Sequence, residues 1–279
     1  MKISLNLKIK NFINVKNFRL RLLSTVLLSL IFVMLFILGN PVLPVFMIFI
    51  FLAVLYEFNI VCNNKFVFVN LINVFVFPLL LLFFLLFEIN VISIPLKDNN
   101  NYYLIFILLA LITNLFFYKI YTNIINFIIS NLLIISFFSL IKMLLIPNGL
   151  NIFLYLVLLV SVMDIFAYIG GNIFGINKIA PTISNGKTIE GTLIGLFFSI
   201  LVSVLIKDLV DINFLYALIL GFTIGLFSFL GDLLESFFKR RIGIKDSGNF
   251  IPGHGGFLDR FDGYILILPL FNLTLIFQI

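Results

Sequence analysis

The chain has 279 residues, of which 62% are hydrophobic and only 11% are charged, and its formal net charge is +6. Soluble domains are nearer half apolar and a quarter charged, so this composition excludes an ordinary soluble protein. The apolar runs are continuous rather than alternating, which favours membrane-spanning helices over a β-barrel. We attribute the positive charge to membrane topology and anionic headgroups, and we expect no nucleic acid as a partner.

A basic stretch at residues 1–20 opens the chain and precedes the first apolar run, which is typical of an uncleaved signal anchor. Nine apolar segments then follow, most of them near the ~20 residues that cross a bilayer. They are residues 21–39, 42–61, 66–88, 102–118, 122–146, 151–170, 192–207, 214–234 and 263–279. The sequence therefore predicts an all-α polytopic membrane protein of about nine transmembrane helices, with residues 1–279 forming a single integral-membrane domain.

Basic residues also predict the topology. With the N-terminus in the cytoplasm, most of the 18 lysine and arginine residues fall on the cytoplasmic side, as the positive-inside rule requires. The polar loops 171–191 and 235–262 then share that side.

The only cysteine, Cys62, excludes an internal disulfide and a cysteine-built metal site. Two Gly-x-x-x-Gly pairs, at 191–195 and 221–225, indicate close helix packing.

Charged residues gather between positions 232 and 262. Asp232, Glu235, Ser236 and Lys239 have the i, i+3, i+4, i+7 spacing of one helix face. Carboxylates are the ligands that Mg²⁺ prefers, so we expect a metal site made by Asp232, Asp259 and Asp262, which would also be the catalytic residues. The alternative is that Asp259 and Asp262 cap the last helix.

Basic residues in the same stretch suit phosphate oxygens and the charge that develops in phosphoryl transfer. They are Lys239, Arg240, Lys245 and Arg260. The alternative for the run at 239–241 is membrane anchoring. Gly253, Gly255 and Gly256 would let the backbone approach a ligand closely. His254, the only histidine, could bind a phosphate or protonate a leaving group, although a turn histidine is more often structural.

Three further features lie upstream. Asp164 is an ionisable residue inside an apolar run, which indicates that it lines a polar cavity or has a partner. Glu57 is a weaker instance that we place at the membrane interface. The loop 184–191 lacks the glycine spacing of a P-loop, yet Lys187 and its neighbours suit phosphate binding. The candidates there are Ser184, Lys187, Thr188 and Glu190, and a helix-capping loop is the alternative.

The stretch 236–262 resembles the C-terminal signature of the phosphatidate cytidylyltransferases, also called CDP-diglyceride synthases. That pattern is Ser-x-apolar-Lys-Arg, four residues, Lys-Asp-x-small, two residues, apolar-Pro/Gly-x-His-Gly-Gly-apolar-x-Asp-Arg-apolar-Asp, and every specified position is met. Asp164-Ile-Phe-Ala-Tyr168 and the loop 184–191 are similar to further family motifs. Asn185 and Gly186 replace a proline and a lysine of the family loop.

The resemblance implies that CTP and phosphatidate react to give CDP-diacylglycerol and pyrophosphate, the committed step of phospholipid synthesis. It implies Mg²⁺ as cofactor, a bacterial inner-membrane location and an active site that faces the cytoplasm. It also adds Asp246 to the substrate-binding candidates, and a homodimer is a possible assembly. The rival functions are a CTP-dependent prenol or dolichol kinase and, from another class, a cation-coupled transporter.

Overall fold

The computed structural model describes residues 15–39, 42–62, 108, 111–112, 115, 124–248, 250 and 255–270. The long helices in this part of the chain are α2 (Val15–Leu38), α3 (Val42–Val61), α7 (Ile124–Leu145), α8 (Gly149–Phe174), α9 (Ile189–Leu205) and α10 (Phe214–Ile242). The short elements are β1 (Lys178–Ala180), β2 (Ser184–Thr188), η3 (Lys207–Leu209), α11 (Leu258–Phe261) and η4 (Asp262–Tyr264).

The described residues form a mainly helical membrane protein. Helices α3, α7, α8 and α10 are each long and apolar enough to cross a membrane, while α9 and the 26–38 part of α2 are apolar but shorter. Six of the nine predicted segments correspond to α2, α3, α7, α8, α9 and α10. Segment 66–88, most of 102–118 and residues 271–279 lie outside the described residues, so the count of nine stays a prediction.

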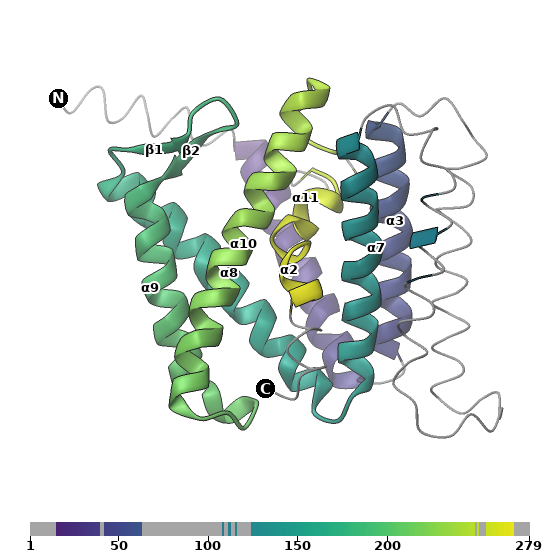
Figure 1. The fold of residues 1–279 in the computed structure, drawn as a ribbon, viewed down its shortest axis with the longest axis vertical. Coiled ribbons are helices and arrows are strands. Elements are labelled where there is room, and N and C mark those ends of the chain that lie inside the picture. The colour runs from purple at the N-terminus through teal and green to yellow at the C-terminus, as the bar shows by residue number, and fades with distance from the viewer. Residues whose placement is uncertain are drawn as a thin grey trace.

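A small β-hairpin in the loop 171–191 departs from the all-α prediction. Strands β1 and β2 pair antiparallel, with Lys178 opposite Thr188 and Ala180 opposite Ser184. Strand β1 has only three residues, β2 is polar throughout, and neither is long enough or apolar enough to show the alternating pattern by which strands are predicted. Figure 1 shows this hairpin at the same end of the molecule as the C-terminal end of α10.

Helix α10 carries the predicted polar face because it continues to Ile242, beyond the predicted end at residue 234. Its first turn is capped by Asn213, whose side chain accepts a hydrogen bond from the Tyr216 amide at 2.9 Å. Its last turn is basic, which suits the negative end of the helix dipole, and Gly243 ends it in the left-handed conformation at φ 82°.

Small residues bring α8, α9 and α10 close together. A Cβ at Gly195 would lie 2.8 Å from the Met163 carbonyl oxygen, and one at Gly221 would lie 2.7 Å from the Ile200 Cα. The Ser199 hydroxyl donates to the Gly221 carbonyl at 2.9 Å across the α9–α10 contact. The close packing predicted from the two Gly-x-x-x-Gly pairs is confirmed.

The chain after α11 packs against α10 equally closely. A Cβ at Gly231 would lie 2.5 Å from the Asp262 carbonyl oxygen, and one at Gly263 would lie 2.9 Å from Ser228 Oγ. These two glycines therefore let η4 lie directly on α10. This contact brings Asp262 next to the helix that carries Asp232.

Aromatic side chains join α3 and α7 to the C-terminal elements. The ring centroids of Phe51 and Phe137 are 4.1 Å apart, and Phe137 stacks on Phe261 at 4.4 Å. Phe58 of α3 stacks on Phe238 of α10 at 5.5 Å. Figure 1 shows α11, which carries Asp259 and Arg260, between the α3–α7 pair and α10.

Candidate active site

A polar cavity of about 260 Å³ lies between α8, the β-hairpin, α9 and α10. Its lining includes five residues that the sequence singles out: Asp164, Ser184, Lys187, Thr188 and Asp232. The structure thus brings together the acid inside α8, the phosphate-type loop and the first acid of the α10 face. Tyr168, Thr192 and Phe229 complete much of the wall.

Lys187 joins the loop to α10. Its Nζ lies 2.7 Å from Asp232 Oδ2, and the same Nζ lies 5.3 Å from the centre of the Phe229 ring. Ser236 donates a hydrogen bond to the other Asp232 oxygen at 3.3 Å. An ammonium and a carboxylate therefore face the cavity as a pair, and both are partly shielded from solvent.

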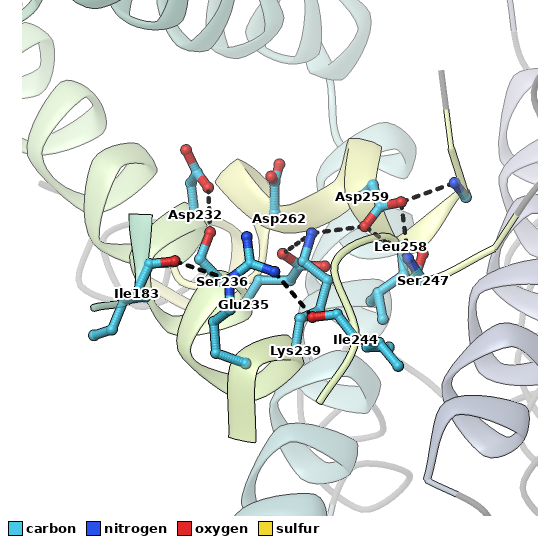
Figure 2. A network of polar contacts seen from close by, with 12 residues as sticks. Ile183, Asp232, Glu235, Ser236, Lys239, Ile244, Ser247, Leu258, Asp259 and Asp262 are labelled. Atoms are coloured by element: carbon cyan, nitrogen blue, oxygen red, sulfur yellow. Dashed lines mark hydrogen bonds and ion pairs between the residues drawn. The ribbon is translucent and has the colours of Figure 1, made fainter. Parts of the chain in front are cut away.

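Asp262 adds a further negative group to this end of the site. Burial raises the pKa of its carboxyl above the ordinary value, and the charges of Asp232 and Asp164 raise it further, against a hydrogen bond from the Gly263 amide. Figure 2 shows Asp232 and Asp262 pointing to the same side of the network. The charges of these three carboxyls therefore act on one another at this end of the site.

Asp259 belongs to a different network. Lys239 Nζ lies 2.7 Å from Asp259 Oδ1 and 2.7 Å from Glu235 Oε2. The amides of Ser247 and Gly256 also donate to Asp259, at 3.0 and 2.9 Å from Oδ2. Burial alone would raise the pKa of Asp259, but these hydrogen bonds outweigh it and hold the pKa below its ordinary value.

In this structure the three carboxylates of the expected cage belong to two separate networks, and the metal site stays a prediction. Figure 2 shows Asp259 turned toward Ser247, away from the side to which Asp232 and Asp262 point. Among the described residues, no group of three Asp, Glu, His or Cys side chains is arranged to hold a metal ion. The reason is that Lys239 and two amides already satisfy the Asp259 oxygens, a partnership that spacing along the chain could not reveal.

Two other predicted substrate-binding residues are engaged with the protein itself. Glu190 accepts hydrogen bonds from the Ile176 and Asn177 amides, at 3.1 and 3.2 Å, and so closes the loop after α8. Arg240 Nε donates to the Ile183 carbonyl at 3.2 Å, and its Nη1 donates to the Ile244 carbonyl at 3.1 Å. Their roles in this structure are to hold the hairpin and the end of α10.

Thr188 both caps a helix and lines the cavity. Its hydroxyl accepts a hydrogen bond from the Gly191 amide at 3.2 Å, as the helix-capping alternative predicts.

Lys245 and Asp246 are exposed in the loop after α10. His254 lies outside the described residues, so its predicted role stays a prediction.

Glu57 has partners that the sequence interpretation did not foresee. It is 2% exposed, and its two oxygens accept hydrogen bonds from the Phe257 and Leu258 amides, each at 2.9 Å. An acid within an apolar helix was the available signal. The glycines of the loop serve the same contact, because a Cβ at Gly256 would lie 2.4 Å from Glu57 Oε2. In this structure the close approach of the backbone at Gly255 and Gly256 is therefore to the carboxylates of Asp259 and Glu57.

An apolar cavity of about 620 Å³ lies beside this region, between α2, α3, α7, α8 and the C-terminal elements. Its walls are almost entirely aliphatic and aromatic, with Phe32, Phe153 and Phe261 among them. Arg260 is the charged residue of the lining. The Arg260 guanidinium is also one of the charges that act on Asp164, which lines the polar cavity.

Comparison with known proteins agrees with this arrangement. The chain is similar to the phosphatidate cytidylyltransferases of Staphylococcus aureus (strain COL) and Staphylococcus haemolyticus (strain JCSC1435), each 48% identical over 131 residues. The phosphatidate cytidylyltransferase of Staphylococcus epidermidis (strain ATCC 35984) is 46% identical over 131 residues. Each alignment covers 46% of this chain and 50% of the relative, so the chain spans about half the length of the relatives it matches.

A family model has the wider coverage. The model described as the cytidylyltransferase family matches residues 19–277, which includes the polar cavity, the apolar cavity and the whole charged stretch before the last segment. Because this match extends over nearly the entire chain, the protein belongs to the cytidylyltransferase family.

Proposed function

We propose that this protein transfers a cytidylyl group from CTP to phosphatidate and releases pyrophosphate. The observation that carries the proposal is the presence of two cavities with unlike linings. One is polar and carries Lys187 and Asp232, and the other is apolar and carries Arg260. A reaction between a nucleotide and a lipid phosphate needs both kinds of surface within reach of one another.

The polar cavity suits the triphosphate of CTP. Lys187 would move from Asp232 to a phosphate oxygen, since an ammonium binds phosphate as a point charge. Ser184 and Thr188 line the same cavity and could donate hydroxyl groups to the phosphates. The volume of about 260 Å³ suits the phosphates and leaves the nucleoside toward the open side.

The apolar cavity suits an acyl chain of phosphatidate. Its volume of about 620 Å³ falls in the range of lipid- and drug-sized ligand sites. Arg260 would hold the phosphate of the lipid by paired hydrogen bonds, close to the acids of the polar cavity. The two substrates are both anions, so holding them together is the main task of the site.

The chemistry requires little proton transfer. A phosphatidate oxygen forms a bond to the α-phosphorus of CTP, and the bond from that phosphorus to the pyrophosphate oxygen breaks. A phosphomonoester has its second pKa near ~6, so the attacking oxygen is already largely ionised at neutral pH and needs no strong base. Lys187 and Arg260 would balance the negative charge of the two substrates.

We propose Mg²⁺ as the cofactor, held by Asp232 and Asp262. Mg²⁺ in phosphoryl-transfer sites is commonly bound by one or two carboxylates and completes its coordination with substrate phosphates. The mutual repulsion of Asp164, Asp232 and Asp262 supports a cation there, whereas the satisfied oxygens of Asp259 do not. When bound, the ion would neutralise charge on the departing pyrophosphate.

The proposed topology has nine spans, the N-terminus in the cytoplasm of a bacterial cell and the site facing the cytoplasm at the inner membrane. Support comes from basic residues that gather at the hairpin end of the molecule: Lys178, Lys187, Lys239, Arg240, Arg241 and Lys245. In a variant with cysteine at Lys245, which is exposed, we expect labelling from the cytoplasmic face only. Labelling from outside would contradict this orientation. A homodimer stays a prediction.

The decisive experiment follows the fate of each phosphate of CTP. Purified full-length protein is incubated with phosphatidate, Mg²⁺ and CTP labelled at either the α- or the γ-phosphate. Cytidylyl transfer puts only the α-label into lipid, whereas a CTP-dependent kinase acting on a prenol would transfer only the γ-label. Absence of α-label from lipid would refute the proposal.

A matched pair of variants connects that activity to the cavity. Asp232→Asn removes the carboxylate that faces Lys187, and we expect it to abolish the transfer of α-label. Asp208→Asn makes the same chemical change at an exposed carboxylate in η3 and should leave transfer intact. Equal activity in both variants would remove Asp232 from the site.

A further inference from the structure

Glu57 reaches the signature stretch from a helix near the other end of the chain. Its Oε1 accepts the Phe257 amide and its Oε2 accepts the Leu258 amide, each at 2.9 Å, while Ser247 Oγ donates to Oε2 at 3.2 Å. These donors are 190 to 201 residues away in sequence. One carboxylate of α3 thus fixes two separate points of the loop between α10 and α11.

The contact satisfies the beginning of α11. The first amides of a helix have no partner within the helix, and Phe257 at the N-cap position has no polar side chain to offer. Glu57 supplies the missing acceptor from another helix, where a carboxylate is also favoured by the helix dipole. Asp259 completes the cap by accepting the Gly256 amide.

The surroundings are shaped to admit this one side chain. A Cβ at Gly248 would lie 2.9 Å from Glu57 Oε1, and a Cβ at Gly256 would lie 2.2 Å from Ser247 Oγ. Any larger residue at Gly256 would therefore displace Ser247 or Glu57. A carboxylate at 2% exposure within an apolar helix is costly unless it is hydrogen-bonded, and here three donors offset that cost.

We propose that Glu57 is a positioning residue for the cytidylyl transfer. By holding the amides of Phe257 and Leu258, it fixes where α11 begins and hence where Arg260 and Asp262 point, one turn later. This inference rests on the proposed function of the site. Glu57 lines neither cavity, so it would act on the rate of transfer through these two residues and not by touching a substrate.

The first test is a comparison of kinetics among Glu57 variants. Glu57→Gln keeps the size but sets an NH₂ group against an amide donor, so we expect kcat to fall about 10²-fold, the scale of a misplacement of roughly 1 Å. The KM for CTP should stay nearly unchanged because Lys187 and Thr188 are untouched. Glu57→Asp, which keeps both acceptor oxygens, should recover part of kcat, and Asp208→Asn is the matched control.

The second test measures the contact itself by hydrogen–deuterium exchange of the full-length protein in detergent. In Glu57→Gln the Phe257 and Leu258 amides should exchange faster, while the interior of α10 exchanges as in the wild type. An unchanged kcat in Glu57→Gln would overturn the proposal, as would a loss of kcat accompanied by faster exchange throughout α10, which would mean general unfolding. A wild-type protein without any α-label transfer would instead refute the proposed function.

Discussion

Lys239 bridges two buried carboxylates, and its replacement by methionine offers a direct measure of that network. Lys239 is 12% exposed at its side chain, Glu235 is 2% exposed and Asp259 is 8% exposed. Within the described part of the chain, the Glu235 oxygens have no hydrogen bond besides this ion pair. Lys239→Met would keep the aliphatic packing and leave the Glu235 carboxyl buried without its ion-pair partner.

The magnitude follows from the burial of the partners. Removing one member of a buried ion pair costs about 3–5 kcal/mol, because the remaining charge stays desolvated. For a protein of this size, a change of 1 kcal/mol corresponds to about 2–4 °C in the unfolding midpoint, so the expected fall in Tm is about 6–20 °C. The assay is thermal unfolding of the purified protein in detergent, followed by the fluorescence of a thiol-reactive dye at Cys62, which is 5% exposed when folded.

Two further variants separate the network from a general loss of packing. Lys239→Met combined with Glu235→Gln removes both charges, and it should recover most of the lost Tm because Asp259 keeps its two amide donors. Lys207→Met breaks an ion pair with an Asp208 that is 83% exposed, and it should cost less than about 1 kcal/mol. A Lys239→Met protein as stable as the wild type, or a double variant no better than the single one, would refute this reasoning.

Two other substitutions test the geometry around the cavity. Gly231→Ala places a methyl group 2.5 Å from the Asp262 carbonyl oxygen, and we expect it to cost about 1–3 kcal/mol in stability, measured by the same unfolding assay, and to lower kcat. A stable and fully active Gly231→Ala would mean that η4 does not lie on α10 as described. Lys187→Met removes the cation paired with Asp232, and it should raise the KM for CTP about tenfold or more, the scale of one charged hydrogen bond. Steady-state kinetics with Lys187→Arg as the control would detect this, and an unchanged KM would place CTP elsewhere.

The helices of this protein could be predicted well because lipid imposes a simple rule on them. Continuous apolar runs must be helical in a membrane, so α3, α7, α8 and α10 were visible from hydropathy alone. The shared face of Asp232 and Lys239 followed from helical spacing, and both do lie on α10. The joining of Asp164, Lys187 and Asp232 at one cavity was expected from their chemistry and from the predicted topology.

Contacts between distant segments were beyond the same reasoning. Spacing along the sequence shows which residues share a face of one helix. It does not show which charged side chains from different segments form an ion pair. The contacts of Asp259 with Lys239 and the loop amides could not be foreseen for this reason. The same is true of Glu57, because its donors are about 200 residues later in the chain. The hairpin was missed because β1 has only three residues and β2 is polar throughout.

The contact between Glu57 and the loop also has a consequence for the order in which the structure forms during synthesis. Helix α3 leaves the ribosome first, and its first partner, Ser247, follows 190 residues later. At roughly 5–20 residues per second, that interval lasts about 10–40 s. During this interval Glu57 has none of its three donors. The loop can adopt the described conformation only after its own residues have been synthesised. The beginning of α11, and with it the placement of Arg260 and Asp262, would therefore be fixed only after α8, the hairpin, α9 and α10 have been synthesised.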